Sequence, residues 1–167
     1  TAALENEQMK SAPRGLSRFL PQKAKTRRKA LDQPGFFVEN GRLNVDGPQV
    51  FADDPVALIR LFHIADQRDL DIHPEAFTTV TRSLALITGK VRKDPAAAEA
   101  FLDVLARGRD TYRILTLMNE SGVLGRYLPE FGRVVAQMQF NMYHSYTVDE
   151  HTLRAVGVIS DIVAGRL

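Results

Sequence analysis

Cysteine is absent from this chain of 167 residues, so it can form no disulfide and offers no thiolate as a metal ligand or nucleophile. Apolar residues never run for the roughly 20 positions that a membrane-spanning helix needs. The N-terminal residues also lack the pattern of a secretory signal peptide. We therefore expect a cytoplasmic protein without a membrane segment. Because the chain begins with Thr1, we also expect both of its ends to be cuts through a longer protein.

Composition indicates about one domain with a packed core, since 44% of the residues are hydrophobic. Charge is unevenly distributed: residues 1–30 carry eight lysines and arginines against two glutamates, whereas residues 31–167 carry fourteen basic and eighteen acidic side chains. The basic segment has no interleaved aromatic residues and no glycine-rich RNA-binding pattern. We expect it to be solvated or to contact an acidic surface, and we rank nucleic-acid binding low.

The fold is predicted to be mainly α, a helical array with one small β-hairpin near residues 36–45. Asn40-Gly41 separates two short β-prone runs, and this dipeptide is the strongest local signal for a two-residue hairpin turn. No other β structure is expected. Helices are predicted from apolar stripes, some of them preceded by a cap. They should run from the caps Asp54-Pro55 and Asp94-Pro95 (the latter to Ala106), over 74–88 with Gly89 ending it, over 111–120, around 134–138, and from Val148, which should bury Val148, Val156, Ile159 and Val163.

Several polar residues attract attention without supporting a catalytic role. Asp69-Leu70-Asp71 has the spacing of a nucleotidyltransferase metal pair, but it falls between predicted helices and no Gly-Ser phosphate-binding turn precedes it. His63 lies on the apolar face of a predicted helix, and His73 precedes a proline. We interpret the acidic pair as an interhelical loop, His63 as a core histidine and His73 as a residue at the start of a helix.

The most informative segment is near the C-terminus, where Thr147 and Glu150 form a T-x-x-E capping box. This box places His151 one turn inside a helix, close to its positive end, which favours the neutral imidazole that binds metals. Spacing alone leaves a surface or core histidine as the more common interpretation.

The same segment resembles the opening of the HD phosphohydrolase domain in the bifunctional uridylyltransferase/uridylyl-removing enzyme family. The resemblance covers most of residues 20–167 and is most specific in the last fifty. It rests on these stretches: 53–55, 58–62, 122–133, 137–140 and His144-x-Tyr146-Thr147-Val148-Asp149-Glu150-His151-Thr152.

The resemblance implies that the whole enzyme attaches UMP from UTP to the PII protein and removes it by hydrolysis, with glutamine as effector, in nitrogen regulation. It also implies a Mg²⁺ or Mn²⁺ site in which His151 is the first ligand. His144 would contact a metal ligand or the phosphate, although a simple turn histidine explains it equally well. A later His-Asp doublet belongs to such sites, but the four histidines here precede Ile64, Pro74, Ser145 and Thr152. The fragment is therefore expected to be catalytically incomplete and to bind no metal firmly.

On this interpretation residues 1–30 are a basic lead-in from an upstream nucleotidyltransferase region, residues 31–133 a helical linker domain, and residues 134–167 the truncated start of the HD domain. Two alternatives stay open. The chain could be a helical scaffold or partner-binding module without catalytic function. It could instead come from an RNA nucleotidyltransferase relative, which the basic segment alone supports.

Overall fold

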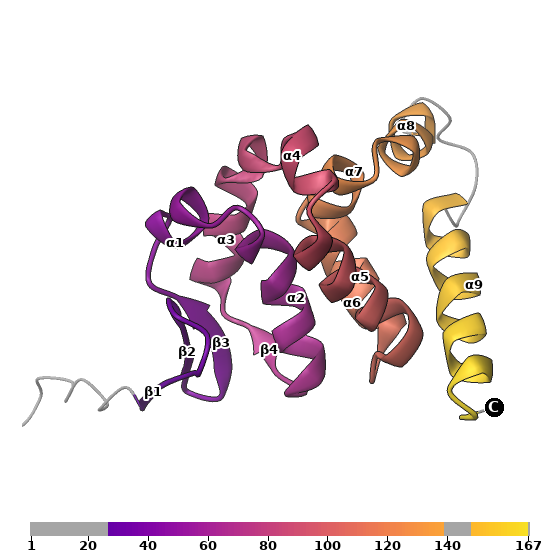
Figure 1. The fold of residues 1–167 in the computed structure, drawn as a ribbon. Helices are drawn as coiled ribbons and strands as arrows, with labels where there is room; N and C mark the ends of the chain where they lie inside the picture. The colour runs from indigo at the N-terminus through magenta and orange to yellow at the C-terminus, as the bar shows by residue number, and fades with distance from the viewer. Residues whose placement is uncertain (1–26, 139–147, 167) are drawn as a thin grey trace, which may run out of the picture.

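The computed structural model describes residues 27–138 and 148–166, with side chains over 27–133 and 150–166. Figure 1 shows a helical array with a small sheet at one side and α9 at the opposite side. The mainly α fold is therefore confirmed. In chain order the elements are β1 (Arg28–Ala30), β2 (Phe36–Glu39), β3 (Arg42–Val45), α1 (Gln49–Asp53), α2 (Ala57–Gln67), β4 (Asp71–Ile72), α3 (Pro74–Arg82), the 3₁₀ helix η1 (Leu84–Leu86), α4 (Gly89–Arg92), α5 (Pro95–Arg107), α6 (Thr111–Glu120), α7 (Val123–Tyr127), α8 (Pro129–Met138) and α9 (Val148–Val163).

The predicted hairpin is present as β2 and β3. Asn40 and Gly41 have φ values of 50° and 82°, the two positive values that a type I′ turn requires. The expectation of no further β structure was wrong, because β1 pairs antiparallel with β2 and β4 pairs parallel with β3. These edge strands have three and two residues, too few for a sequence periodicity. Their pairing depends on the finished hairpin beside them.

The start of α2 lies later than predicted. Asp54-Pro55-Val56 forms a turn in which the Ala57 amide donates to the Asp54 carbonyl (3.0 Å), and α2 begins at Ala57. Asp54 still caps this turn, since its carboxylate accepts the Val56 amide at 3.1 Å and the Arg60 guanidinium at 2.6 Å. The apolar face of α2 is buried as expected, with Phe62 and its neighbours at the centre of the core.

The helix predicted over 74–88 ends at Arg82, and Gly89 begins α4 rather than ending the helix before it. The hydroxyl of Ser83 donates to the Thr79 carbonyl at 2.8 Å, as the hydroxyls of Thr79 and Thr81 do to carbonyls four residues earlier. Such side-chain bonds compete with the helical backbone ladder. Three of them in the last turns explain why the helix gives way to η1.

The start of α5 confirms the predicted cap, and α6, whose range was predicted without one, has a cap of the same kind. The carboxylate of Asp94 accepts the Ala96 amide at 2.8 Å, and that of Asp110 accepts the Arg113 amide at 3.0 Å. Gly122 follows α6 with a φ of 84°, the left-handed conformation expected after a helix.

Only a helix around 134–138 was predicted between Gly122 and Val148, but the region forms α7 and the longer α8. Gly125 lies inside α7 and touches Gly132 of α8: a Cβ at Gly132 would lie 2.7 Å from the Gly125 carbonyl oxygen. These glycines therefore allow two helices to approach closely, which a turn signal in the sequence does not reveal.

The predicted buried face of α9 is partly wrong. Ile159 and Val163 are 60% and 70% exposed, and Val156 is half-buried. The face that packs on the array instead consists of Leu153, Gly157 and Ser160. The side chain of Val148 lies outside the described residues.

Candidate functional site

The candidate ligand His151 is the fourth residue of α9 and is exposed. Its neighbour Glu150 pairs with Arg154 at 3.3 Å, one turn further along the helix. Thr147, the other half of the predicted capping box, and His144 lie outside the described residues. The structure thus places His151 near the N-terminal end of a helix that packs on the helical array.

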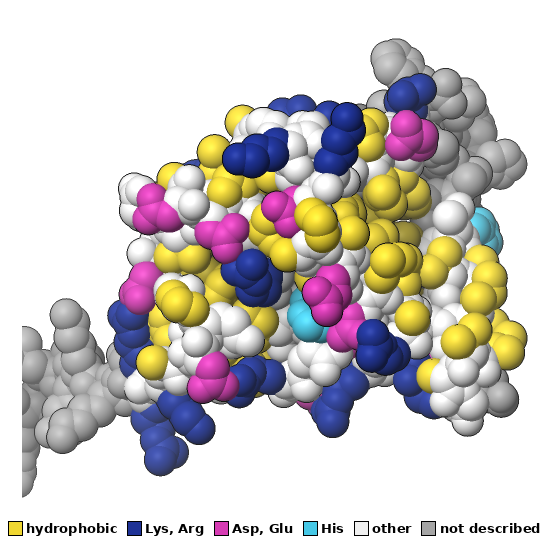
Figure 2. Space-filling model, in the orientation of Figure 1, with side chains coloured by type: hydrophobic (Ala, Val, Ile, Leu, Met, Phe, Trp, Pro, Cys, Tyr) yellow, Lys and Arg dark blue, Asp and Glu magenta, His cyan; other side chains and the backbone are white. Residues whose placement is uncertain are grey.

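Small side chains determine how closely α9 approaches the array. Gly157 faces Tyr112 of α6, and a Cβ at Gly157 would lie 3.0 Å from the Tyr112 Cβ. Leu153, one turn earlier, is 4% exposed and enters the apolar core. Beside it lies an apolar cavity of about 140 Å³, lined by Phe101, Leu128 and others. Figure 2 shows hydrophobic side chains continuing from the array to α9.

A buried pair of hydroxyls forms the polar contact between α9 and the array. Thr111 and Ser160 are 2% and 3% exposed, and their oxygens are 2.8 Å apart. The Thr111 hydroxyl donates its one proton to the Val104 carbonyl of α5 at 2.9 Å. Ser160 is therefore the donor to Thr111, and the pair links α9, α6 and α5. Gly108 leaves room for this contact, since a Cβ there would lie 2.7 Å from the Thr111 oxygen.

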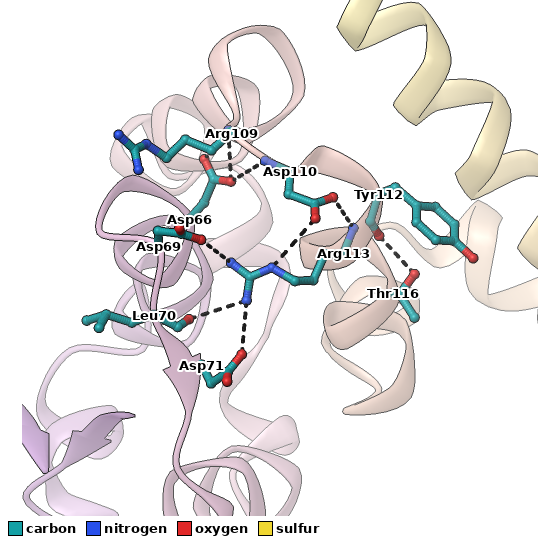
Figure 3. A network of polar contacts seen from close by, with 9 residues as sticks. All are labelled: Asp66, Asp69, Leu70, Asp71, Arg109, Asp110, Tyr112, Arg113 and Thr116. Carbon is teal, nitrogen blue, oxygen red and sulfur yellow. Dashed lines mark hydrogen bonds and ion pairs between the residues drawn. The ribbon is translucent and has the colours of Figure 1, made fainter. Parts of the chain in front are cut away.

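The loop before Thr111 is fixed by a fully buried carboxylate, Asp66, at the end of α2. Its oxygens accept the amides of Arg109 and Asp110 at 3.0 Å (Figure 3). Buried carboxylates are rare unless such donors satisfy them. Asp66 therefore anchors the α5–α6 loop, and through it the start of α6 on which α9 packs.

Figure 3 also shows why the Asp69-Leu70-Asp71 segment needs no metal to explain it. The guanidinium of Arg113 lies 3.7 Å from the Asp69 carboxylate and 3.5 Å from that of Asp71, and it donates to the Leu70 carbonyl at 3.4 Å. Asp69 has a positive φ of 51°, and Asp71 begins β4. The two carboxylates thus hold the α2–β4 connection to α6.

His63 and His73 both have structural partners. The ring of His63 lies 2.7 Å from the Asp103 carboxylate, which also pairs with Arg107. His73 caps α3, because its Nδ1 accepts the Glu75 amide at 3.2 Å.

Sequence reasoning did not foresee that His73 would meet two carboxylates, Glu39 and Glu75, with ligand atoms within 4.8 Å of one another. The Nδ1 of His73 uses its lone pair for the Glu75 amide, so the neutral ring carries its proton on Nε2. That nitrogen faces Glu39 at 3.9 Å and has no lone pair to give a metal. Asn44 donates to both carboxylates, at 2.8 and 3.4 Å. The cluster fits a helix cap better than a metal site.

Two arginines in the resembling stretch 122–133, Arg126 and Arg133, could contact a phosphate, but the described part of the structure does not bring them together with other candidate residues. Arg126 and Arg133 are exposed, and Arg133 pairs with Glu130 at 3.7 Å. Within the described ranges, the metal-type donors that gather are Glu39, His73 and Glu75, and His151 is not among them. No cluster of three or more metal-type donors among the described residues includes His151.

Comparison with known proteins identifies the family. Residues 36–127 match the family model described as the uridylyltransferase GlnD third domain. This chain belongs to the GlnD uridylyltransferase family. The matched range runs from β2 to the end of α7, so this GlnD domain is the hairpin and the helical array that carries α9.

Similar proteins in two bacteria carry the same name. The bifunctional uridylyltransferase/uridylyl-removing enzyme of Caulobacter vibrioides (strain NA1000 / CB15N) is 69% identical over 167 residues, all of this chain and 18% of that protein. Its counterpart in Phenylobacterium zucineum (strain HLK1) is 66% identical over 166 residues, again 18% of its length. The chain thus spans less than a fifth of these GlnD relatives. No solved structure matches it, and within the described ranges no helix is long and apolar enough to cross a membrane.

Proposed function

We propose that this chain is an internal segment of a bifunctional enzyme that transfers UMP from UTP to the PII protein and removes it again by hydrolysis. Identity of 69% over the whole chain to proteins named for both activities carries this proposal. Control of nitrogen assimilation with glutamine as effector, in the cytoplasm, belongs to the same proposal.

We divide the segment into a basic lead-in at 1–30, a helical domain at 31–133 and the start of an HD hydrolase domain at 134–167. The composition of α9 supports the last boundary. Leu153 contacts the array, while Val158, Ile159, Ile162 and Val163 on its other side are 49–70% exposed. A helix that is apolar on both sides is typical of one buried on both sides, as in a larger domain.

His151 would supply one ligand of a divalent-metal site, with Mg²⁺ or Mn²⁺, in the longer protein. One histidine does not make such a site, because these ions need several oxygen donors as well. The His-Asp doublet of such sites is absent from the sequence, so we expect the isolated chain to bind Mn²⁺ weakly at most. Calorimetry that measured submicromolar Mn²⁺ binding by the isolated chain would show that ligands within it had been missed.

The decisive experiment compares UMP release from uridylylated PII by the full-length protein and its His151→Ala variant. We expect release to be lost and UMP transfer to be kept, because the hydrolytic site is separate. His63→Ala is the matched control, since it removes a histidine of the array and should leave the ratio of release to transfer unchanged. Equal release by His151→Ala and the parent would support the alternative, a non-catalytic helical scaffold.

A further inference from the structure

We propose that the contact formed by Gly157 and Ser160 with Tyr112 and Thr111 positions α9, and with it His151, for the hydrolytic reaction. We call these four residues the α9 seat. The inference rests on the proposed function of His151. It adds positioning residues from both sides of the domain boundary. Thr111 and Tyr112 belong to the GlnD third domain, whereas Gly157 and Ser160 follow it.

The α9 seat defines both the distance and the rotation of the helix. Gly157 sets the distance, because its missing side chain lets α9 contact the Cβ of Tyr112. Ser160 sets the rotation, because its hydroxyl has to meet the Thr111 oxygen at 2.8 Å in a site from which water is excluded. A buried hydroxyl without a partner is costly, so other rotations of the helix are disfavoured.

The partner surface is itself rigid. The Thr111 hydroxyl is held by the Val104 carbonyl, and the loop that leads into α6 is held by the buried carboxylate of Asp66. A series of polar contacts thus runs from α2 through the α5–α6 loop to α9. Tyr112 lies on the side of α6 that faces α9 in Figure 3.

The α9 seat can affect the position of His151 because α9 carries His151 as well as Gly157 and Ser160. Nine residues separate His151 from Ser160, roughly 14 Å along an α-helix. Because a helix moves as a rigid rod over that length, a shift or rotation at the seat displaces the imidazole by a comparable amount. Catalytic groups lose rate steeply when displaced by about 1 Å.

The first test uses the absence of cysteine from these 167 residues. In the full-length protein, Thr111→Cys/Ser160→Cys should crosslink on mild oxidation, since oxygens 2.8 Å apart leave room for sulfurs joined at about 2.05 Å. Mass spectrometry identifies the linked peptides. The control pair Thr116→Cys/Ser160→Cys should not crosslink, because position 116 lies roughly 7.5 Å further along α6 than position 111, beyond the reach of a disulfide. Failure of the first pair to crosslink would overturn the proposal.

The second test measures the two activities. Gly157→Leu should lower UMP release at least about tenfold, because the larger side chain pushes α9 off Tyr112. UMP transfer should stay within about twofold, since the proposed transferase region lies upstream of this segment. The oxidised Thr111→Cys/Ser160→Cys protein should keep its release activity. Unchanged release in Gly157→Leu, an equal loss of both activities, or loss of release on crosslinking would each refute the positioning role.

The result for His151→Ala separates the two levels of inference. If His151→Ala abolishes release while Gly157→Leu does not, the seat fails and the proposed site stands. If His151→Ala releases UMP normally, both fail.

Discussion

Replacing Asp66 by alanine should destabilise the helical array, because two backbone amides lose their hydrogen-bond acceptor at once. The side chain is fully buried and accepts two backbone amides, those of Arg109 and Asp110, each at 3.0 Å. A buried donor left without a partner costs about 1–3 kcal/mol. Arg109 and Asp110 are themselves exposed, so the lower part of this range applies to each amide, and the predicted loss in the free energy of unfolding is about 2–3 kcal/mol.

The geometry also predicts a graded series. Both amides reach Oδ1 of Asp66, and Oδ2 accepts only that of Arg109. Asp66→Asn keeps an oxygen that can take the place of Oδ1, so its cost should be about 1–2 kcal/mol, the difference between a charged and a neutral acceptor. Asp32→Ala is the matched control: its carboxylate is 93% exposed and pairs with Arg68 at 3.2 Å, so its removal should not change stability measurably.

Urea unfolding of the 167-residue chain, followed by circular dichroism, measures this series. In a parallel thermal scan, at about 2–4 °C per kcal/mol, the melting temperature of Asp66→Ala should fall by roughly 4–12 °C. The reasoning is refuted if Asp66→Ala is as stable as Asp32→Ala, or if Asp66→Asn is the less stable of the two Asp66 variants.

Two further predictions concern single side chains. Gly122→Ala should destabilise the chain by at least about 1 kcal/mol more than Gly47→Ala. Both glycines have a φ near +85°, but only a Cβ at Gly122 meets another residue, the Leu84 Cδ1 at 2.8 Å, so equal losses on denaturant unfolding would contradict this reason. Burial, and then the nearby Asp94, raise the pKa of the Tyr127 phenol above 10, so the folded state holds this proton more tightly than the unfolded state and stability should fall as pH rises above about 10. Tyr127→Phe should lessen that fall, and an identical alkaline stability profile would contradict the prediction.

Local signals in the sequence predicted those elements whose determinants lie within a few residues. Asn40-Gly41 fixes the hairpin because its two residues tolerate positive φ. Asp94 fixes the start of α5 because its side chain bonds an amide two residues ahead. Such interactions need no knowledge of the rest of the chain.

Sequence patterns likewise indicated some residues of the candidate site and missed others. The sequence pointed to the helix carrying His151, and α9 is present. It did not point to Ser160 or Thr111, because a hydroxyl 49 positions from its partner leaves no local pattern. The only signal available was the spacing of Gly157 and Ser160, which places them on one side of α9, whereas the prediction followed the apolar residues Val156, Ile159 and Val163.

By itself, the sequence determined the mainly α class, the hairpin, the capped helices and the family resemblance, because composition, capping and motifs act over short distances along the chain. Tertiary structure alone decided that Gly125 and Gly132 join two helices, that Asp66 holds the α5–α6 loop, and that α9 packs through its small residues. Each of these depends on which surfaces come within contact of one another. Which surfaces meet is decided only when the whole core packs. A glycine or a buried carboxylate becomes favourable only where another element comes close to it, and no local sequence pattern shows this.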